Sequence, residues 1–193
     1  AFLPSDELRQ AAHLSVADYF ERHPEQQEMT PRKAAEWPYQ LQGAKAWDRL
    51  EACLTDLELF LALFNEKTKW ELTSYWHPLR SLDRDMGRCY SAAYARWVAI
   101  PSNTDDHYVA NELGQFLTNN GLHSAAEPLL RRALEASERA LGAEHPDTLG
   151  SVNNLAGLLD SQGDYAAAEP LYRRALEARE RVLGPEHPHT LMV

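Results

Sequence analysis

The feature that most constrains this chain is a phrase of thirty residues that occurs twice. Residues 121–150 read GLHSAAEPLLRRALEASERALGAEHPDTLG, and residues 163–192 read GDYAAAEPLYRRALEARERVLGPEHPHTLM. The copies begin 42 residues apart and are identical at 21 of the 30 aligned positions. Self-similarity at a fixed period is the signature of stacked repeats, in which each unit buries its apolar face against the next. The repetition therefore predicts a binding scaffold that carries no reaction chemistry.

Helical periodicity divides residues 101–193 into two helix pairs and the start of a third. Leu113 and Phe116 share one face of a helix expected over about 105–120. The turn that follows is assigned to Gly121, because glycine readily adopts the left-handed conformation that ends a helix. The remaining helices are expected over about 124–141, over 147–162 with Asp147 or Thr148 as its N-cap, and over 165–183.

Residues 1–100 lack this repeat and are expected to form a separate compact helical module. They hold all five tryptophans, and such large aromatic side chains are expected in its core: Trp37, Trp47, Trp70, Trp76 and Trp97. A first helix is expected to end at residue 22 and to be capped by Ser5. Later helices are expected over 36–42, 47–53, 57–64, 67–76 (ending before Pro78) and about 83–99. With no strand expected, the predicted fold class is all-α.

The second half resembles the tetratricopeptide repeat. The residues that carry the resemblance are Leu113-Gly114, Gly121, His123, Ala126, Leu130 and Ala133, and then Leu155-Ala156, Gly163, Tyr165, Ala168, Tyr172 and Ala175. The usual unit has about 34 residues, whereas the 42-residue period and the LG-x-EHP-x-T linker are similar to the extended units of kinesin light chains and nephrocystin-3-like proteins. The resemblance implies a short α-α superhelix that serves as a protein–protein interaction scaffold within a larger multidomain protein.

The first half is similar to the helical segment that precedes such repeats in nephrocystin-3-like proteins. The phrases that carry this likeness are HLSVADYFE (13–21), RKAAEWPYQL (32–41), WDRLEACLTDLELF (47–60) and ELTSYW (71–76). In those larger proteins an NTPase of the signal-transducing (STAND) type often lies upstream. An alternative function is therefore the ligand-sensing regulatory arm of such an NTPase. The chain has no G-x-x-x-x-G-K-[ST] phosphate loop, so that domain would lie outside it.

The resemblance also implies a site, because the first helix of each tetratricopeptide pair lines a groove that receives a peptide. The corresponding residues are Tyr108, Asn111, Glu112, Gln115, Asn119, Asn153, Asn154, Asp160 and Ser161. Asparagine suits this task, since one amide can donate to a peptide carbonyl and accept from a peptide N–H. The alternative is that these are solvated polar residues. Tyr108 against Gly150, and Glu112 against Asn154, differ between the copies and are expected to set specificity.

The charge pattern indicates which partners are expected. Residues 1–100 have 12 Lys and Arg against 15 Asp and Glu, and residues 101–193 have 7 against 14, which together give the net charge of −10. Such a surface repels nucleic acids and anionic membranes. Glu112 and Asp160 would repel an acidic peptide, so the expected partner is a basic or neutral protein segment. An RNA-binding helical repeat is kept as an alternative.

Catalytic, metal and cofactor sites are not expected. The chain lacks G-x-S-x-G, H-E-x-x-H and a glycine-rich phosphate loop, and His187-x-His189 is interpreted as part of a linker. The pairs Arg131-Arg132 and Arg173-Arg174 are expected to form ion pairs with nearby glutamates of their own helices. No secretory signal or membrane-length apolar run is present, which favours a cytoplasmic protein. The last repeat is expected to self-associate or fray, because it lacks a cap.

Overall fold

A computed structural model describes residues 5–23, 28–65 and 68–184, leaving aside the side chain of residue 183. Every regular element in those ranges is an α-helix, which confirms the predicted all-α fold class. The chain divides into two compact units, residues 1–95 (unit 1) and residues 96–193 (unit 2). The division falls inside a helix, a few residues before the boundary that the sequence pattern places at residue 100.

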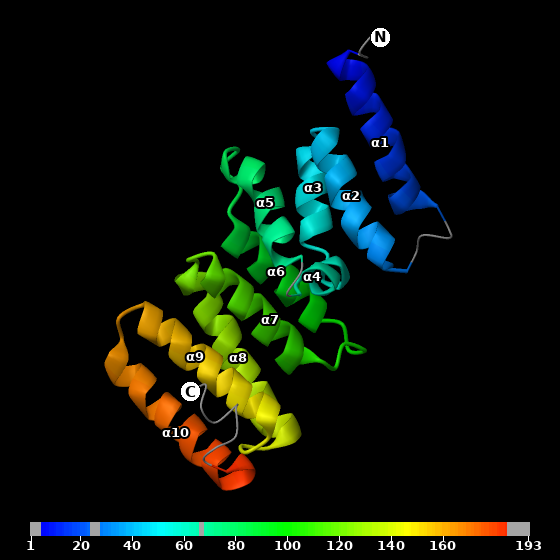
Figure 1. The fold of residues 1–193 in the computed structure, drawn as a ribbon. Coiled ribbons are helices and arrows are strands. Elements are labelled where there is room, and N and C mark those ends of the chain that lie inside the picture. The colour runs from blue at the N-terminus through cyan, green and yellow to red at the C-terminus, as the bar shows by residue number, and fades with distance from the viewer. Residues whose placement is uncertain (1–4, 24–27, 66–67, 185–193) are drawn as a thin grey trace. The chain divides into compact units, whose positions relative to one another are not determined.

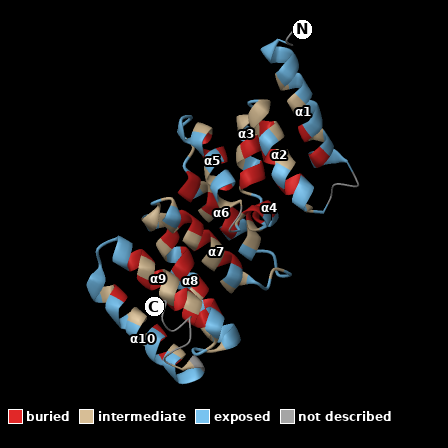
Figure 2. Ribbon diagram, in the orientation of Figure 1, coloured by how far each residue is buried: buried red, intermediate tan, exposed pale blue. Residues whose placement is uncertain are grey.

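In unit 1 the second helix contacts four of the other helices (Figure 1). In chain order the helices are α1 (Asp6–Arg22), α2 (Pro31–Gly43), α3 (Trp47–Leu54), α4 (Leu57–Leu63), α5 (Lys69–Arg80) and α6 (Met86–Val98). Contacts join α2 to α1, α3, α4 and α5. Helix α1 buries only Ala17 and Phe20, and Figure 2 shows it as mostly exposed.

Capping side chains explain where the first two helices begin. Ser5 accepts a hydrogen bond from the backbone N–H of Leu8 at 3.3 Å, so its predicted role as N-cap is confirmed. Helix α2 begins five residues before the predicted residue 36, because Thr30 caps it by accepting from the N–H of Lys33 at 3.1 Å. Pro31 then occupies the first turn, where its missing N–H has no helical partner to lose.

Helix α5 shows where the sequence reading of a proline is wrong. The helix was expected to end before Pro78, but it continues to Arg80. A proline inside a helix removes one backbone hydrogen bond, and here that loss falls in the last turn. Leu79 is fully buried, so packing of that turn against the core offsets the lost bond.

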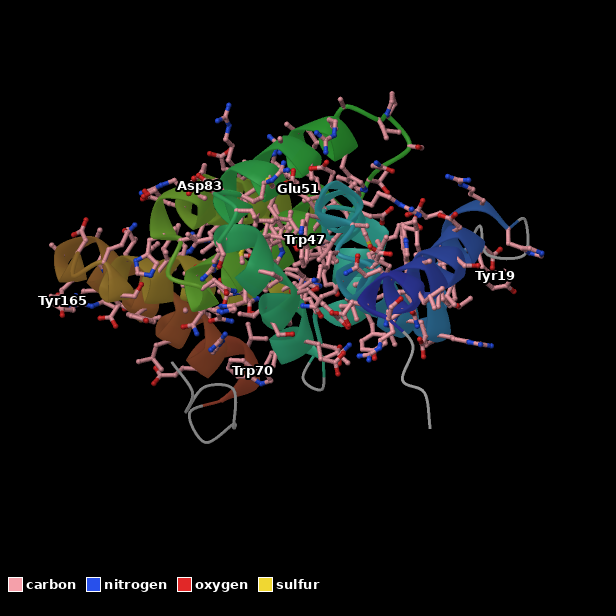
Figure 3. All side chains as sticks on the ribbon, turned by 90° about the horizontal axis from the view of Figure 1, so that it is seen from above. Tyr19, Trp47, Glu51, Trp70, Asp83 and Tyr165 are labelled. Carbon is pink, nitrogen blue, oxygen red and sulfur yellow. The ribbon has the colours of Figure 1, made fainter. Side chains whose placement is uncertain are left out.

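The core of unit 1 contains one fully buried tryptophan. Trp76 is 0% exposed, and its indole N–H donates to the hydroxyl of Tyr90 at 3.2 Å. Trp70 is 72% exposed, and Figure 3 shows it at the surface, so the expectation that this tryptophan belongs to the core is wrong. Leu72, Trp76 and Leu79 follow one helical stripe, and Trp70 lies on the opposite side of α5.

Unit 2 is a stack of two antiparallel helix pairs (Figure 1). Its helices are α7 (Asp106–Asn119), α8 (His123–Leu141), α9 (Pro146–Ser161) and α10 (Tyr165–Leu183). Contacts join α7 to α8, α8 to α9, and α9 to α10. Both pairs turn at a glycine with positive φ, 72° at Gly121 and 81° at Gly163, a conformation that other residues rarely adopt. These four helices agree closely with the predicted ranges.

Within the first pair, a glycine lets two helices approach closely. A Cβ placed on Gly114 of α7 would lie 2.5 Å from Cδ2 of Leu130 on α8, far inside van der Waals contact. Leu113, Leu117 and Leu130 are all fully buried. Burying one such side chain contributes about 1.5–3 kcal/mol, so this contact is a main source of stability in the pair.

Helix α9 begins one residue earlier than predicted, which corrects the expected N-cap. Asp147 or Thr148 was expected to cap it, but His145 is the N-cap, and its Nδ1 accepts from the N–H of Asp147 at 3.2 Å. Pro146 is the first helical residue, because its fixed φ already suits a helix and its missing N–H would be unpaired there.

The paired arginines form ion pairs, and the first arginine of each pair does so within its own helix, as predicted. Arg131 contacts Glu127 at 2.9 Å and Arg173 contacts Glu169 at 2.6 Å, each over one helical turn. Exposed pairs of this spacing contribute about 0.3–0.5 kcal/mol.

The second arginine of each pair forms an ion pair with another helix. Arg132 on α8 contacts Asp106 on α7 at 2.6 Å, and Arg174 on α10 contacts Glu138 on α8 at 2.6 Å. These contacts between helices were not predicted from the sequence. A long arginine side chain can reach either partner, and sequence spacing alone does not distinguish the two.

Candidate peptide-binding groove

Helices α7 and α9, the first helix of each pair, border a cavity of about 260 Å³. We refer to it as the α7–α9 cavity. Its lining consists of His107, Tyr108, Asn111, Glu112 and Gln115 from α7, Ser137 from α8, and Pro146, Asp147, Gly150, Ser151 and Asn154 from α9. Most of these side chains are polar, which suits a segment of peptide better than an apolar ligand.

The structure brings together five of the nine residues that the sequence assigned to a groove. Those that line the α7–α9 cavity are Tyr108, Asn111, Glu112, Gln115 and Asn154. Those that lie outside it are Asn119, Asn153, Asp160 and Ser161. Three of the outer four are exposed, and the side-chain oxygen of Asn153 is buried without a hydrogen-bond partner among the described residues.

A chain of hydrogen bonds connects the two helices across the cavity. Nδ2 of Asn154 donates to Oδ1 of Asn111 at 2.9 Å, and Nδ2 of Asn111 donates to Oε1 of Glu112 at 3.2 Å. Both ends of the Asn111 amide are therefore engaged, and this residue orients its neighbours. The side-chain amide oxygen of Asn154, Oδ1, is then available to accept a hydrogen bond from a ligand.

Glu112 is a half-buried carboxylate at the end of this chain. Burial raises the pKa of Glu112 above its ordinary value, and the hydrogen bond from Asn111 opposes that rise. No lysine or arginine among the described residues forms an ion pair with it, in contrast to Glu127, Glu138 and Asp106. The carboxylate therefore bears a desolvation penalty that a cationic ligand would offset.

Tyr108 and Gly150 give the cavity its asymmetry. They occupy equivalent positions of the two copies, 42 residues apart. The Tyr108 side chain is 51% exposed, whereas no atom lies within 4 Å of a Cβ placed on Gly150. Burial, and then the charge of Glu112, raise the pKa of the Tyr108 hydroxyl. The cavity is thus lined by the aromatic ring of Tyr108 on the α7 side, and it is open at Gly150 on the α9 side.

Several lining residues were not found from the sequence. They are His107, Ser137, Pro146, Asp147 and Ser151. Pro146 lies one residue before the predicted start of helix α9, and Asp147 was expected to be its N-cap and not a groove residue. Ser137 and Ser151 are buried and their hydroxyls lie 3.3 Å apart. Small polar residues at positions 137 and 151, among the apolar positions of their helices, are the sequence signal that could have indicated this contact.

Other kinds of site find little support in the part of the chain that the structure describes. It contains no group of three or more His, Cys, Asp and Glu side chains placed to hold a metal ion. The His187-x-His189 pair lies outside the described residues. None of the described helices is long and apolar enough to span a bilayer.

Replacing Glu112 with glutamine is expected to raise the stability of unit 2 at neutral pH. Because burial raises the pKa of this carboxyl in the folded chain, the proton binds the folded state more tightly than the unfolded state. Protonation of this carboxyl therefore adds to the free energy of unfolding. That contribution is fully present below the unfolded-state pKa and is lost as pH rises through the folded-state pKa. Glutamine has no charge to desolvate, so thermal unfolding followed by circular dichroism should give a higher Tm for Glu112→Gln than for the parent.

The pH dependence of the same measurement provides its control. The difference in Tm should shrink as pH falls below about 4.3, where glutamate is protonated in both states. Glu135→Gln changes an exposed glutamate of α8 and should leave Tm nearly constant. A lower Tm for Glu112→Gln at neutral pH would contradict the expected penalty.

Comparison with known proteins relates the second half of the chain to a repeat family. The family model named tetratricopeptide repeat matches residues 105–181 and again residues 149–193. Nephrocystin-3 of Mus musculus is 31% identical over 157 residues, which cover 79% of this chain and 12% of that protein. Nephrocystin-3 of Xenopus tropicalis is 48% identical over 123 residues, which cover 61% of this chain and 9% of that protein. The chain therefore spans only a small part of the length of these relatives.

The match to the mouse protein extends beyond the repeats. Residues 101–193 make up less than half of the chain, so a match over 79% of it includes part of the first hundred residues. Among solved structures, a Podosopora anserina protein described as a kinesin light chain with nearly identical TPR-like repeats gives a TM-score of 0.49 at 15% identity. That match covers 90% of this chain and 87% of that protein.

Proposed function

The chain belongs, through residues 105–193, to the tetratricopeptide repeat family, and on this premise we propose that it binds a segment of a partner protein in the α7–α9 cavity. The predicted resemblance to repeats of the nephrocystin-3 type is confirmed by the same comparisons. Tetratricopeptide repeats generally mediate the binding of protein partners. The observation that carries the proposal is the hydrogen-bonded row of Asn154, Asn111 and Glu112, which places polar groups from both helices in one cavity.

The proposed ligand is a basic or neutral peptide. Glu112 and Asp147 line the cavity, and none of the described residues that line it is a lysine or an arginine. A peptide carboxylate would meet charge of its own sign in a partly desolvated site, which costs free energy. Asp160, the other carboxylate from which the sequence predicted this preference, lies outside the cavity. The proposed role is binding without catalysis, as is general for this family.

Filling the cavity tests the proposal. Gly150→Tyr places a ring where a new Cβ meets no atom within 4 Å, so the helix should tolerate it. Peptides would be selected from a displayed random library on the parent chain, labelled, and measured by fluorescence polarisation. We expect Gly150→Tyr to weaken their binding by on the order of tenfold or more, through loss of the contacts made inside the cavity. Its Tm should stay at or above the parent value, because glycine disfavours a helix interior.

A matched variant shows whether the effect is local. Ala140 is exposed on α8 and does not line the cavity, so Ala140→Tyr adds the same side chain elsewhere. It should bind the selected peptides like the parent. Equal binding by Gly150→Tyr and the parent would rule out the α7–α9 cavity as the peptide site.

A second candidate is the regulatory arm of a STAND-type NTPase. It is favoured by the match to nephrocystin-3 that extends into the first hundred residues, ahead of the repeats. A G-x-x-x-x-G-K-[ST] phosphate loop encoded upstream of residue 1 in the full gene would support this candidate. A full gene without such a loop would contradict it.

Self-association is proposed for the outer face of helix α10. Leu176 and Val182 of α10 are 37% and 50% exposed. Exposed apolar side chains on a repeat surface favour contact with a second copy. Sedimentation equilibrium would show dimers at rising concentration, and a strict monomer would contradict the proposal.

A further inference from the structure

The charges around the α7–α9 cavity select for a cation. Its lining holds the carboxylates of Glu112 and Asp147, and none of the described residues that line it is a lysine or an arginine. Two like charges near one partly enclosed space give it a negative potential. A ligand with a positively charged side chain is attracted to this potential, which lowers the free energy of the complex.

The shape of the lining favours a flat cation with several hydrogen-bond donors. Tyr108 and Glu112 are one helical turn apart on α7, so a ring and a carboxylate lie on the same face. Gly150 leaves open space beside them, and the carbonyl oxygen of Asn154 provides a second acceptor. A guanidinium stacks on aromatic rings and donates to a carboxylate in a forked geometry, whereas an ammonium does neither as well.

The support behind Glu112 holds its carboxylate in place. Asn111 donates to Oε1 of Glu112 and is itself held by Asn154 across the cavity. With Oε1 engaged in this way, Oε2 remains to meet a ligand. A carboxylate fixed by a neighbour loses less conformational entropy on binding than a free one.

We propose that the α7–α9 cavity selects one arginine side chain of its peptide, with the guanidinium between the Tyr108 ring and the Glu112 carboxylate. This inference rests on the proposed function, since it specifies the ligand of the same cavity. Lysine is expected to bind less tightly, because its ammonium cannot form the forked contact.

Peptides selected on the intact chain provide the test. Replacing the key arginine of a selected peptide with citrulline keeps its shape and removes its charge. Affinity should then fall by on the order of tenfold or more, since hydrogen bonds to a charged group are the stronger ones. Glu112→Gln should cause a similar loss with the arginine peptide. Combined with citrulline, it should add little further loss, as expected for two partners of one contact.

Two further variants assign the effect to Glu112. Asp147→Asn removes the other carboxylate of the lining, and Glu135→Gln removes an exposed one on α8. Glu135→Gln should not change affinity, and Asp147→Asn should reduce it less than Glu112→Gln. If Asp147→Asn reduces the affinity for the arginine peptide and Glu112→Gln does not, the assignment to Glu112 is overturned.

The remaining outcomes separate this inference from the proposed function. Selected peptides that Gly150→Tyr blocks, but that lack arginine or tolerate citrulline, overturn the inference and leave peptide binding in the cavity standing. Selected peptides that Gly150→Tyr does not affect, or the absence of any selected peptide, overturn the proposed function and this inference with it.

Discussion

Replacing Trp76 with alanine should destabilise unit 1 by about 3–5 kcal/mol, the largest loss expected in this chain. The indole is fully buried, and its ring centre lies 5.5 Å from that of Tyr90, which in turn lies 5.4 Å from Phe60. The substitution leaves a cavity among these rings. It also leaves the Tyr90 hydroxyl without the indole N–H that donates to it.

Trp70→Ala is the matched control, because it removes the same side chain from a site that is 72% exposed. We expect a change within about 0.5 kcal/mol for this variant. Urea unfolding followed by far-ultraviolet circular dichroism would measure both. The two variants have equal numbers of tryptophans, so their fluorescence can also be compared directly. Similar losses for Trp76→Ala and Trp70→Ala would contradict the core described for unit 1.

Gly114→Ala should destabilise unit 2 by about 1–3 kcal/mol, although alanine favours a helix. The new Cβ would lie 2.5 Å from Cδ2 and 2.6 Å from Cγ of Leu130. Leu130 is fully buried, so it can move only by displacing its neighbours. The expected result is a lower midpoint in urea with an unchanged slope.

Gly157→Ala provides the comparison on the second pair. Its new Cβ would lie 3.6 Å from the hydroxyl of Tyr172, which is an ordinary contact. Helix propensity should then dominate, and stability should rise by up to about 1 kcal/mol. A stabilising Gly114→Ala, or equal effects at both glycines, would show that α7 and α8 are not packed this closely.

The regular half of the fold could be predicted because its helices follow local signals. Leu113, Leu117 and their counterparts repeat at helical spacing, and Gly121 marks a turn by a conformation that few other residues adopt. Trp70 could also have been placed correctly, since it lies off the stripe formed by Leu72 and Trp76. The continuation of α5 past Pro78 could not have been predicted, because the packing of Leu79 that offsets the lost hydrogen bond is a tertiary effect.

The candidate site was only partly predictable, for a geometric reason. Comparing copies at the 42-residue period relates Asn111 to Asn153, and Glu112 to Asn154. In the structure, however, Asn111 bonds to Asn154, 43 residues away. Equivalent positions point the same way from their own helices, so the partners across a cavity are not equivalent positions. Which residue of α9 faces Asn111 depends on how the two helices pack.

The contact between Arg174 on α10 and Glu138 on α8 has a consequence for longer arrays. It joins the second helices of successive repeats, so it strengthens the interface between repeats and not the repeats themselves. Both side chains are about one-third exposed, so dissolved ions weaken the attraction. Buried leucines within each pair do not respond to salt in that way. Ionic strength therefore tunes the contact between neighbouring repeats, and with it how cooperatively they unfold.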